Sequence, residues 1–331
     1  MSKHLLSARI VSNARLVHWL DHLGTEENMR VQRNLSKAGA VAAISLLALT
    51  GCGGGDGAAS TEPEDTGDAR EANADIAAMV PESISADGKL VIGVDPSIAP
   101  MVYEDPATKE ITGFEGELAR EIAAVLGLEP EFAKSPFTGL IAGLDAKRYE
   151  TVMSFVVDTK ERQETVDFVD YFKVGAGILV PKGNPDGIEQ PLDLCGVKTV
   201  VGSNSAGERA ADAISEDCTA EGKPAIDKLV VQAPTDIPQA LTTGRADAAL
   251  NASVLVAYSQ AQAPESFDVA GEFFGEVPGG ALFHKDDAEL RDAVAQAVVE
   301  LQEDGTYDAL LEEYGLEFAS LEGAPVNAAE G

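Results

Sequence analysis

The chain has 331 residues, enough for more than one domain, and its formal net charge at pH 7 is −32. So acidic a surface repels the phosphate backbone, which excludes DNA and RNA as partners. Histidine is scarce: after residue 22 only His284 remains, so no set of histidines can bind a metal, and the sequence predicts no cofactor.

The first predicted element is an export signal. Residues 38–49, AGAVAAISLLAL, follow three basic residues and form an apolar run that is too short to cross a bilayer, as in a signal peptide. The run leads to Leu49-Thr50-Gly51-Cys52, which resembles the bacterial lipobox, where cleavage precedes the cysteine and its thiol is acylated. We therefore expect residues 1–51 to be removed and Cys52 to anchor the protein by lipid to the extracellular face of the cell membrane. The alternative is a short buried helix followed by an ordinary cysteine.

Three further predictions concern the ends of the chain. Met29-Arg30 begins a signal of normal length, and we hypothesise that translation starts at Met29. Residues 52–81 are rich in Gly, Ala, Asp, Glu and Thr and cannot bury enough apolar surface to fold, so they are expected to form a disordered linker. Residues 319–331 are expected to form a disordered tail.

The body of the chain alternates between strand and helix patterns. Residues 89–95 predict a strand, and residues 113–128 place apolar side chains at helical spacing. Residues 137–146 predict a short helix and residues 151–157 a buried strand. The alternation continues over residues 198–201, 206–214, 228–232, 237–242 and 246–251, and two helices follow at 290–301 and 307–314. This order predicts an α/β fold with mixed, mostly parallel sheets.

Two glycine-containing strands, at residues 174–181 and 277–285, bracket the middle of the sequence. A chain that crosses to a second lobe and returns needs two such connectors, and hinges of this kind close two lobes around a ligand. We therefore expect lobe 1 to comprise residues 82–178 and 280–318, and lobe 2 to comprise residues 179–279.

Cys195 and Cys218 are the only cysteines besides Cys52. Two cysteines within one lobe of an exported protein predict a disulfide, worth about 3 kcal/mol for a loop of this length. Two free thiols are the alternative.

Short sequence pieces between residues 82 and 318 occur in the order of a known family. They are Gly93-Val94-Asp95, Ala99-Pro100, Gly113-Phe114, Leu126-Gly127, Thr159-Lys160-Glu161-Arg162, Val166-Asp167-Phe168, Gly244-Arg245-Ala246-Asp247-Ala248 and Asp304-Gly305-Thr306. The ordered set resembles the periplasmic-type extracellular solute-binding proteins of ABC importers, polar amino-acid class, family 3. The segment from Cys218 to Ile226 looks like the actinobacterial lipoprotein branch. The resemblance implies a two-lobed monomer that clamps a small solute and delivers it to an ABC permease and its ATPase.

The resemblance also implies a ligand site. Arg162 matches the arginine that binds the ligand's carboxylate, and a guanidinium can hold a carboxylate bidentately. A structural ion pair with a neighbouring acid is the alternative. Ser205 matches a hydroxyl that assists at the same carboxylate, and Ser154 matches the pocket-edge hydroxyls. Asp95 ends the first strand, where ligand sites of α/β folds form. Phe137 matches an apolar wall, or else belongs to the ordinary core.

Four positions depart from the family pattern. Ile98 stands where an aromatic lid is usual, and Phe155 and Val157 stand where hydroxyls are usual. Ala252 replaces the aspartate that holds the ligand's ammonium, and an ammonium buried without a counter-charge is costly. We hypothesise a carboxylate ligand that lacks an α-ammonium or presents its amine differently. Compensation by Asn251 after a one-residue shift, or a degenerate site, are the rival accounts.

Three functions are compatible with these residues. The first is a transport receptor that carries out no chemistry and is not an enzyme. The second is a ligand-sensing lipoprotein for a signalling partner. The third is a dehydratase-type enzyme on the same fold, which needs an acid or base positioned in the cleft.

Overall fold

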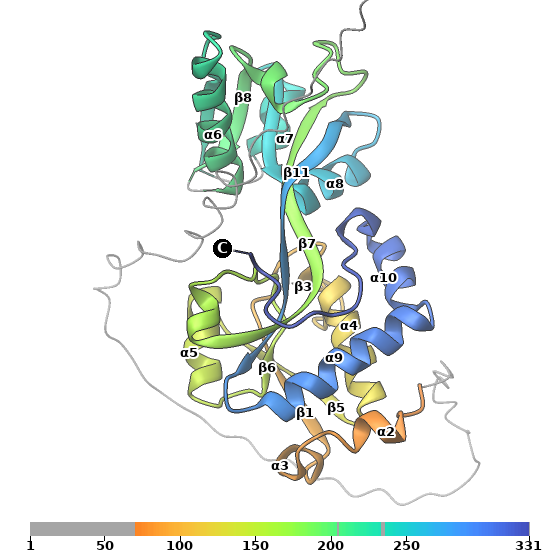
Figure 1. Ribbon diagram of the computed structural model, residues 1–331. Helices are drawn as coiled ribbons and strands as arrows, with labels where there is room; N and C mark the ends of the chain where they lie inside the picture. The colour runs from red at the N-terminus through yellow and green to blue at the C-terminus, as the bar shows by residue number, and fades with distance from the viewer. Residues whose placement is uncertain (1–69, 204, 233–235, 331) are drawn as a thin grey trace, which may run out of the picture. The chain divides into compact units, whose positions relative to one another are not determined.

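The computed structural model describes residues 70–203, 205–232 and 236–330 (Figure 1). The expected signal peptide, the proposed start at Met29 and the expected lipidation of Cys52 lie outside these residues. Among the described residues, no helix is both long and apolar enough to span a bilayer.

Eight strands form one sheet, in the order β5-β1-β6-β11-β7-β10-β8-β9, and β2, β3 and β4 form a small second sheet. The strands are β1 Lys89–Val94, β2 Ser97–Ile98, β3 Val102–Glu104, β4 Ile111–Thr112, β5 Glu129–Lys134, β6 Thr151–Val152, β7 Val166–Pro181, β8 Lys198–Gly202, β9 Asp227–Val231, β10 Ala248–Ala252 and β11 Phe267–His284. Strand β1 pairs in parallel with β5 and β6, and β8 pairs in parallel with β9 and β10. Antiparallel pairing joins β6, β11, β7 and β10, so the predicted mixed, mostly parallel α/β sheet is confirmed.

Helices cover both faces of this sheet. They are α2 Ala74–Ala77, α3 Glu82–Ser85, α4 Phe114–Val125, α5 Leu140–Asp145, α6 Ala206–Ala220, α7 Asp236–Thr242, α8 Ser253–Gln262, α9 Ala288–Glu303 and α10 Thr306–Tyr314. Short 3-10 turns add η2 Phe137–Gly139, η3 Arg162–Glu164, η4 Pro191–Leu194 and η5 Glu317–Ala319. Helix α4 begins after Gly113 because the glycine has φ +98° and a Cβ there would lie 2.6 Å from the Met101 carbonyl oxygen.

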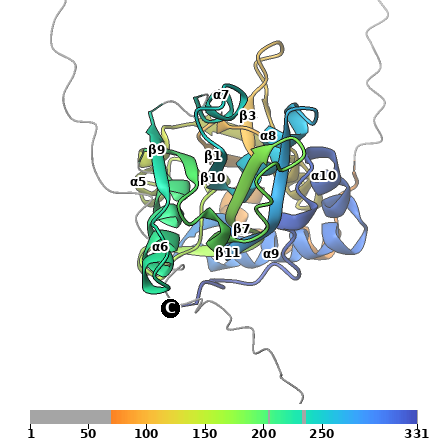
Figure 2. The ribbon, with the colours of Figure 1, turned by 90° about the horizontal axis from the view of Figure 1, so that it is seen from above.

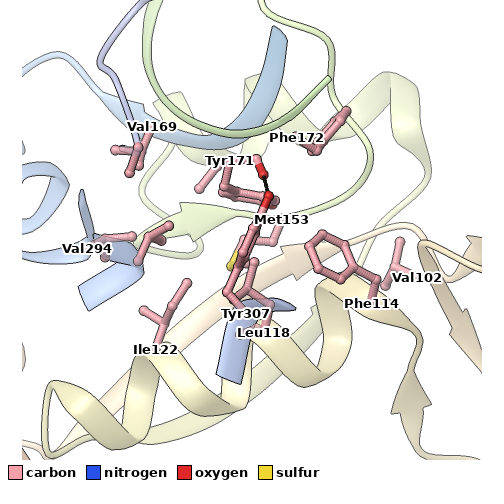
Figure 3. Packing of buried hydrophobic residues seen from close by; sticks show 14 of the residues in the cluster. Val102, Phe114, Leu118, Ile122, Met153, Val169, Tyr171, Phe172, Val294 and Tyr307 are labelled. Carbon is pink, nitrogen blue, oxygen red and sulfur yellow. Dashed lines mark hydrogen bonds between the residues drawn. The ribbon is translucent and has the colours of Figure 1, made fainter. Parts of the chain in front are cut away.

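The first lobe is a three-layer arrangement around β1, β6 and the adjoining halves of β7 and β11. Alternate residues of β1, such as Leu90 and Ile92, face α4 and α9 in one apolar cluster. Val152 and Phe168 face the other way and pack with α5. Figure 3 shows the first cluster from close by, with the Tyr307 hydroxyl of α10 donating a 2.5 Å hydrogen bond to the Tyr171 carbonyl of β7.

The second lobe is layered in the same way around β10, β8 and β9. Ile178, Val201 and Leu250 pack on α6, whereas their sequence neighbours face α7 and α8. Those neighbours are Leu179, Val200 and Ala249. Figure 2 shows α6 apart from α7 and α8, with the strands between them.

Strands β7 and β11 run side by side through both lobes (Figure 1). They pair from Val166 with His284 to Pro181 with Phe267, with shifts of register between Ala270 and Val277 and again between Gly279 and Gly280. The predicted crossovers at 174–181 and 277–285 are parts of these strands, and the two-lobed fold is confirmed. The predicted lobe boundaries fall inside the two strands and stay a prediction.

The predicted strand over residues 151–157 is wrong beyond Val152. The chain leaves the sheet because Phe155 has φ +50°, a left-handed conformation that does not fit a strand. Val157 returns only as an isolated bridge to Gly279.

Two segments that were expected to lack structure are ordered where the structure describes them. Arg70 binds Glu121, Asp304 and Thr306, and Asn73 accepts hydrogen bonds at the start of α2, so the expected linker is folded from residue 70. Residues 320–330, in the expected disordered tail, lie along β7: the Asp170 N–H donates to the Pro325 carbonyl at 2.9 Å. Composition did not reveal these contacts because each depends on a partner that lies far away in the sequence.

The predicted disulfide is confirmed. Cys195, at the end of η4, is bonded to Cys218 near the end of α6, with Cα atoms 5.7 Å apart. The bond fixes the loop before β8 to the helix that follows it. Cys218 is fully buried beside Leu194 and Ile214.

Candidate functional site

Asp95, Ser154 and Phe137 meet where β1 and β6 end. These strands are parallel neighbours, so their carboxyl ends open at the same edge of the sheet. The Asp95 N–H donates to Ser154 Oγ at 2.8 Å, and Asp95 Oδ2 accepts the Phe137 N–H at 2.7 Å. Ser154 is fully buried, and Phe137 packs half-buried against the apolar cluster of α5. The structure thus brings three predicted residues together and gives Phe137 a core contact as well.

Phe155 and Val157 are packed into the first lobe. The Phe155 ring stacks on Phe172 with centroids 5.4 Å apart, and Val157 is 3% exposed. Ile98, at the end of β2, packs against the same cluster. The positions where the family resemblance leads one to expect hydroxyls are therefore occupied by apolar side chains, of which Val157 is buried and Phe155 half-buried.

Glu115 is a buried acid beside these residues that sequence reasoning missed. Its Oε2 accepts the Phe155 N–H at 2.6 Å, and its Oε1 accepts the Tyr171 hydroxyl at 2.7 Å. Complete burial raises the pKa of Glu115 to about 7, although both hydrogen bonds act in the opposite direction. The sequence did indicate that Glu115 is buried. It lies three residues before Leu118 and seven before Ile122, and so shares their helix face.

Arg162 begins η3 in a short loop that its own side chain closes. Its Nη1 donates to the Val157 carbonyl at 2.6 Å, and its backbone N–H donates to Thr159 Oγ1 at 3.2 Å. The Gln163 N–H bonds the Thr159 carbonyl at 2.9 Å. The loop follows Ser154 and Phe155 directly, which places the half-buried guanidinium at the same end of the first lobe.

Ser205 and Asn251 lie at the corresponding edge of the second lobe. Strands β8 and β10 are parallel, and Ser205 caps α6 by accepting the Glu208 N–H at 3.2 Å. Asn251 Oδ1 accepts the N–H of Ala252 at 2.9 Å. Helix α6 lies against β10, since a Cβ on Gly207 would be 2.0 Å from the Leu250 carbonyl oxygen. The strand ends therefore hold both predicted residues close to the start of α6.

Contacts around β7 connect the predicted site residues of the first lobe with those of the second lobe. Ala252 is 8% exposed and belongs to the same apolar cluster as Phe172, against which Phe155 and Ala206 also pack. Ser253 Oγ accepts the N–H of Gly175 at 3.1 Å and so ties α8 to the middle of β7. In the described part of the chain, no group of three His, Cys, Asp or Glu side chains is arranged to hold a metal ion.

Comparison with known proteins gives the family of the chain. Residues 90–317 match the bacterial extracellular solute-binding proteins, family 3. The arginine-binding protein ArgT of Corynebacterium glutamicum is 29% identical over 256 residues, which are 76% of this chain and 83% of that protein. The histidine-binding periplasmic protein of Salmonella typhimurium is 30% identical over 233 residues, covering 68% of this chain and 87% of the other.

A solved structure gives the same result. The chain resembles an ancestral cationic amino acid solute-binding protein with a TM-score of 0.61 and 31% identity, over 70% of this chain and 98% of that one. Sequence, fold and the placement of the strand ends therefore lead to one assignment. The chain belongs to the bacterial extracellular solute-binding proteins, family 3.

Proposed function

We propose that this protein binds an amino acid or a related small carboxylate between its two lobes and delivers it to the permease of an ABC importer. Relatives named as arginine-binding and histidine-binding proteins support an amino-acid class of ligand. The observation that carries the proposal is Arg162, held by the Val157 carbonyl and by Thr159 in the loop after β6. The protein acts as a binding module and carries out no chemistry.

Arg162 is proposed to bind the carboxylate of the ligand. The guanidinium stays charged at any physiological pH, and its planar fork matches two carboxylate oxygens. Half-burial reduces the screening of this interaction by water. Ser205, the cap of α6, adds a hydroxyl and the partial positive charge of a helix N-terminus on the side of the second lobe.

The amino group of the ligand is proposed to be absent or bound in an unusual way. Phe155, Val157 and Ala252 offer no charge, and the structure packs all three against apolar neighbours. Asn251 is the one predicted site residue in the second lobe with a carbonyl oxygen on its side chain. That oxygen has a second lone pair besides the one that accepts the Ala252 N–H.

We also propose that Cys52 is acylated and holds the protein, as a monomer, at the extracellular face of the cell membrane, in the manner of an actinobacterial lipoprotein. The support is the sequence around Cys52, with its apolar run and basic residues. Mass spectrometry of the protein from its native membrane checks this: a diacylglyceryl group on an N-terminal Cys52 is expected. An unmodified Cys52 within a longer chain would contradict the anchor.

Calorimetry with matched ligands tests the binding proposal. L-Arginine is compared with agmatine, which lacks the carboxylate, and with 5-guanidinopentanoate, which lacks the α-amine; L-histidine, histamine and imidazolepropionate form a second set. We expect carboxylate-bearing probes of one set to bind, the compound without a carboxylate to fail, and the compound without an amine to retain most of the affinity. Retention of affinity by the compound without a carboxylate would contradict the role of Arg162. A large loss on removing the amine would contradict the missing amino anchor.

Arg162→Gln is expected to weaken binding of the carboxylate probes by roughly 100-fold or more, because two charge-assisted hydrogen bonds are lost. Arg245→Gln is the matched control, since Arg245 is exposed between α7 and β10. Equal effects of the two substitutions would show that charge in general, and not Arg162, governs binding.

A further inference from the structure

The tail of the chain covers an open edge of β7. Strand β10 pairs only with residues 176–179 of β7, so the earlier half of that strand has one edge free of other strands. Tail residues occupy it: Val326 bridges Val169, and Ser320 bridges Phe172. Asn327 fixes the register, because its Oδ1 accepts the Phe168 N–H at 2.8 Å while its backbone N–H bonds the Phe168 carbonyl at 3.2 Å.

Beyond Asn327 the tail ends on two buried carboxyl groups. Asp158 and Asp170 are 2% and 0% exposed. The Ala328 N–H donates to Asp170 Oδ2, and the Ala329 N–H donates to Asp158 Oδ2, each at 2.9 Å. Two adjacent carboxyl groups thus receive one backbone donor each from consecutive residues of the tail.

A proton between the two carboxyl groups would complete their hydrogen bonding. Asp170 Oδ1 is buried and receives no hydrogen bond from the described residues, although such an atom is costly to leave without a partner. A proton held between Asp170 and Asp158 satisfies this oxygen and removes one of two like charges from the interior. In agreement, burial and then the neighbouring Asp158 raise the pKa of Asp170 to about 8.

Asp158 connects this pair to the arginine loop. Its two oxygens accept Gln163 Nε2 at 2.9 and 2.8 Å, and Gln163 directly follows Arg162. On the other side, Asp158 follows Val157, whose carbonyl holds the Arg162 guanidinium at 2.6 Å. The tail, the carboxyl pair and the loop that carries Arg162 therefore form one continuous chain of hydrogen bonds.

We propose that the proton-sharing pair Asp158–Asp170, capped by the tail residues 327–329, positions Arg162 for the ligand's carboxylate. The inference deepens the proposed function and rests on it. Asp158 and Asp170 act as positioning residues, since the loop lies between them and the bound ligand. When the shared proton is lost, two negative charges face each other, the cap loosens and Arg162 loses its fixed place.

The other charged groups around the pair are engaged elsewhere. Asp167 binds Lys285 and Arg291, and Glu115 accepts the hydroxyl of Tyr171, the residue after Asp170. Lys160 Nζ donates to Gln163 Oε1 at 3.3 Å on the exposed side of the loop. Burial raises the pKa of Glu115 to about 7, so Glu115 titrates in the same range as the pair. The pH dependence is assigned to the pair by comparing wild type, at equal pH, with a protein changed only at Asp170.

The test compares ligand affinity between pH 7 and pH 9 in the full chain, with L-arginine, or L-histidine if it binds more tightly, as the probe. Asp170→Asn keeps an acceptor for Ala328 and offers a permanent donor to Asp158, so it replaces the shared proton. We expect it to match wild type at pH 7 and to exceed wild type by about tenfold at pH 9. The ligand's own amine titrates in this range, so proteins are compared at equal pH. Exposed Glu216→Gln on α6 is the control and is expected to follow wild type.

Two further variants disrupt the carboxyl pair or remove the tail residues that cap it. Asp158→Ala and a chain that ends after Val326 are expected to lose about tenfold in affinity at pH 7. Both are expected to speed hydrogen exchange of amides in residues 157–165 without any ligand.

Equal pH profiles for wild type and Asp170→Asn would overturn the inference, as would unchanged exchange and affinity in the variants. Arg162→Gln separates the two claims: if it loses binding while the pair's variants do not, only the positioning role fails. If no probe binds, hydrogen exchange still decides the positioning role.

Discussion

Phe155 has a backbone conformation that few side chains adopt, and a buried acid helps to maintain it. A residue other than glycine at φ +50° carries strain of about 1–3 kcal/mol. The 2.6 Å hydrogen bond to Glu115 and the ring stack on Phe172 offset that strain. The strain lies in the segment that leads from β6 to Arg162, so Glu115 contributes to the path of the site loop.

Glu115→Gln tests this role. A glutamine supplies only one acceptor oxygen, so either the Phe155 N–H or the Tyr171 hydroxyl loses its partner in the interior. We expect the free energy of unfolding to fall by about 1–3 kcal/mol, measured by urea denaturation at pH 7. Exposed Glu129→Gln at the start of β5 is the control. A loss no larger than in the control would show that Glu115 does not stabilise the turn.

Asp170 predicts a dependence of stability on pH. Its pKa is raised from 3.8 to about 8 in the folded protein, so the folded state retains a proton that the unfolded chain has already released. A rise in pH between the unfolded and folded pKa values therefore favours unfolding. The contribution of protonated Asp170 to the stability of the fold is lost completely above about pH 8. We expect wild type to lose stability relative to Asp170→Asn as the pH rises from 5 to 9 in denaturant titrations. A constant difference between the two proteins would mean that Asp170 is ionised throughout.

At the scale of elements, many of the strands and helices could be predicted, whereas β5, α8 and the turns around the proposed site were not. Apolar periodicity identified β1 and α4, because each element turns a single apolar face or run toward the core. Residues 153–157 look equally apolar, yet the Phe155 turn depends on Glu115, which is 40 residues earlier in the chain. Local sequence carries no information about such a partner.

The two ends of the fold were missed for a related reason. Residues 320–330 have the composition of a tail, and their order comes from backbone pairing with the edge of β7. Arg70 is likewise fixed by acids on α4 and after α9, through its bonds to Glu121 and Asp304. Composition indicates whether a segment can form an apolar core of its own. It does not indicate whether the segment can pack against a domain that is already folded.

The disulfide gives a prediction for the second lobe. Cys195→Ser with Cys218→Ser removes a link across 23 residues, and we expect the free energy of unfolding to fall by about 3 kcal/mol. Guanidinium denaturation with and without reductant measures it, because reduced wild type is expected to match the double variant. If reduction leaves the wild-type midpoint unchanged, the bond does not stabilise this lobe.

At the scale of the whole molecule, β7 and β11 join the lobes as two continuous strands. Their pairing shifts register between Ala270 and Val277, and Gly175 lies within this region, where a Cβ would be 2.5 Å from the Phe274 carbonyl oxygen. Irregular pairing makes bending easier there, as a hinge between two lobes requires. The sequence predicted two crossovers from their glycines, but not that each crossover is part of a strand shared by both lobes.

The proposed site likewise draws its residues from both lobes. Arg162, Ser154 and Asp95 belong to the first lobe, and Ser205 and Asn251 to the second. These residues could be named from the sequence because the family resemblance supplied them. The contacts of Glu115, Asp158 and Asp170 that hold the site loop could not be predicted, because they form only in the folded chain. Binding is proposed to require both sets, which ties affinity to closure of the lobes.

A crystal structure of the full chain with the ligand that calorimetry identifies tests the central claim most directly. The account predicts the ligand's carboxylate within hydrogen-bond distance of the Arg162 guanidinium, with residues of both lobes in contact with the ligand. A ligand whose carboxylate is bound away from Arg162, or one held by a single lobe, would contradict it.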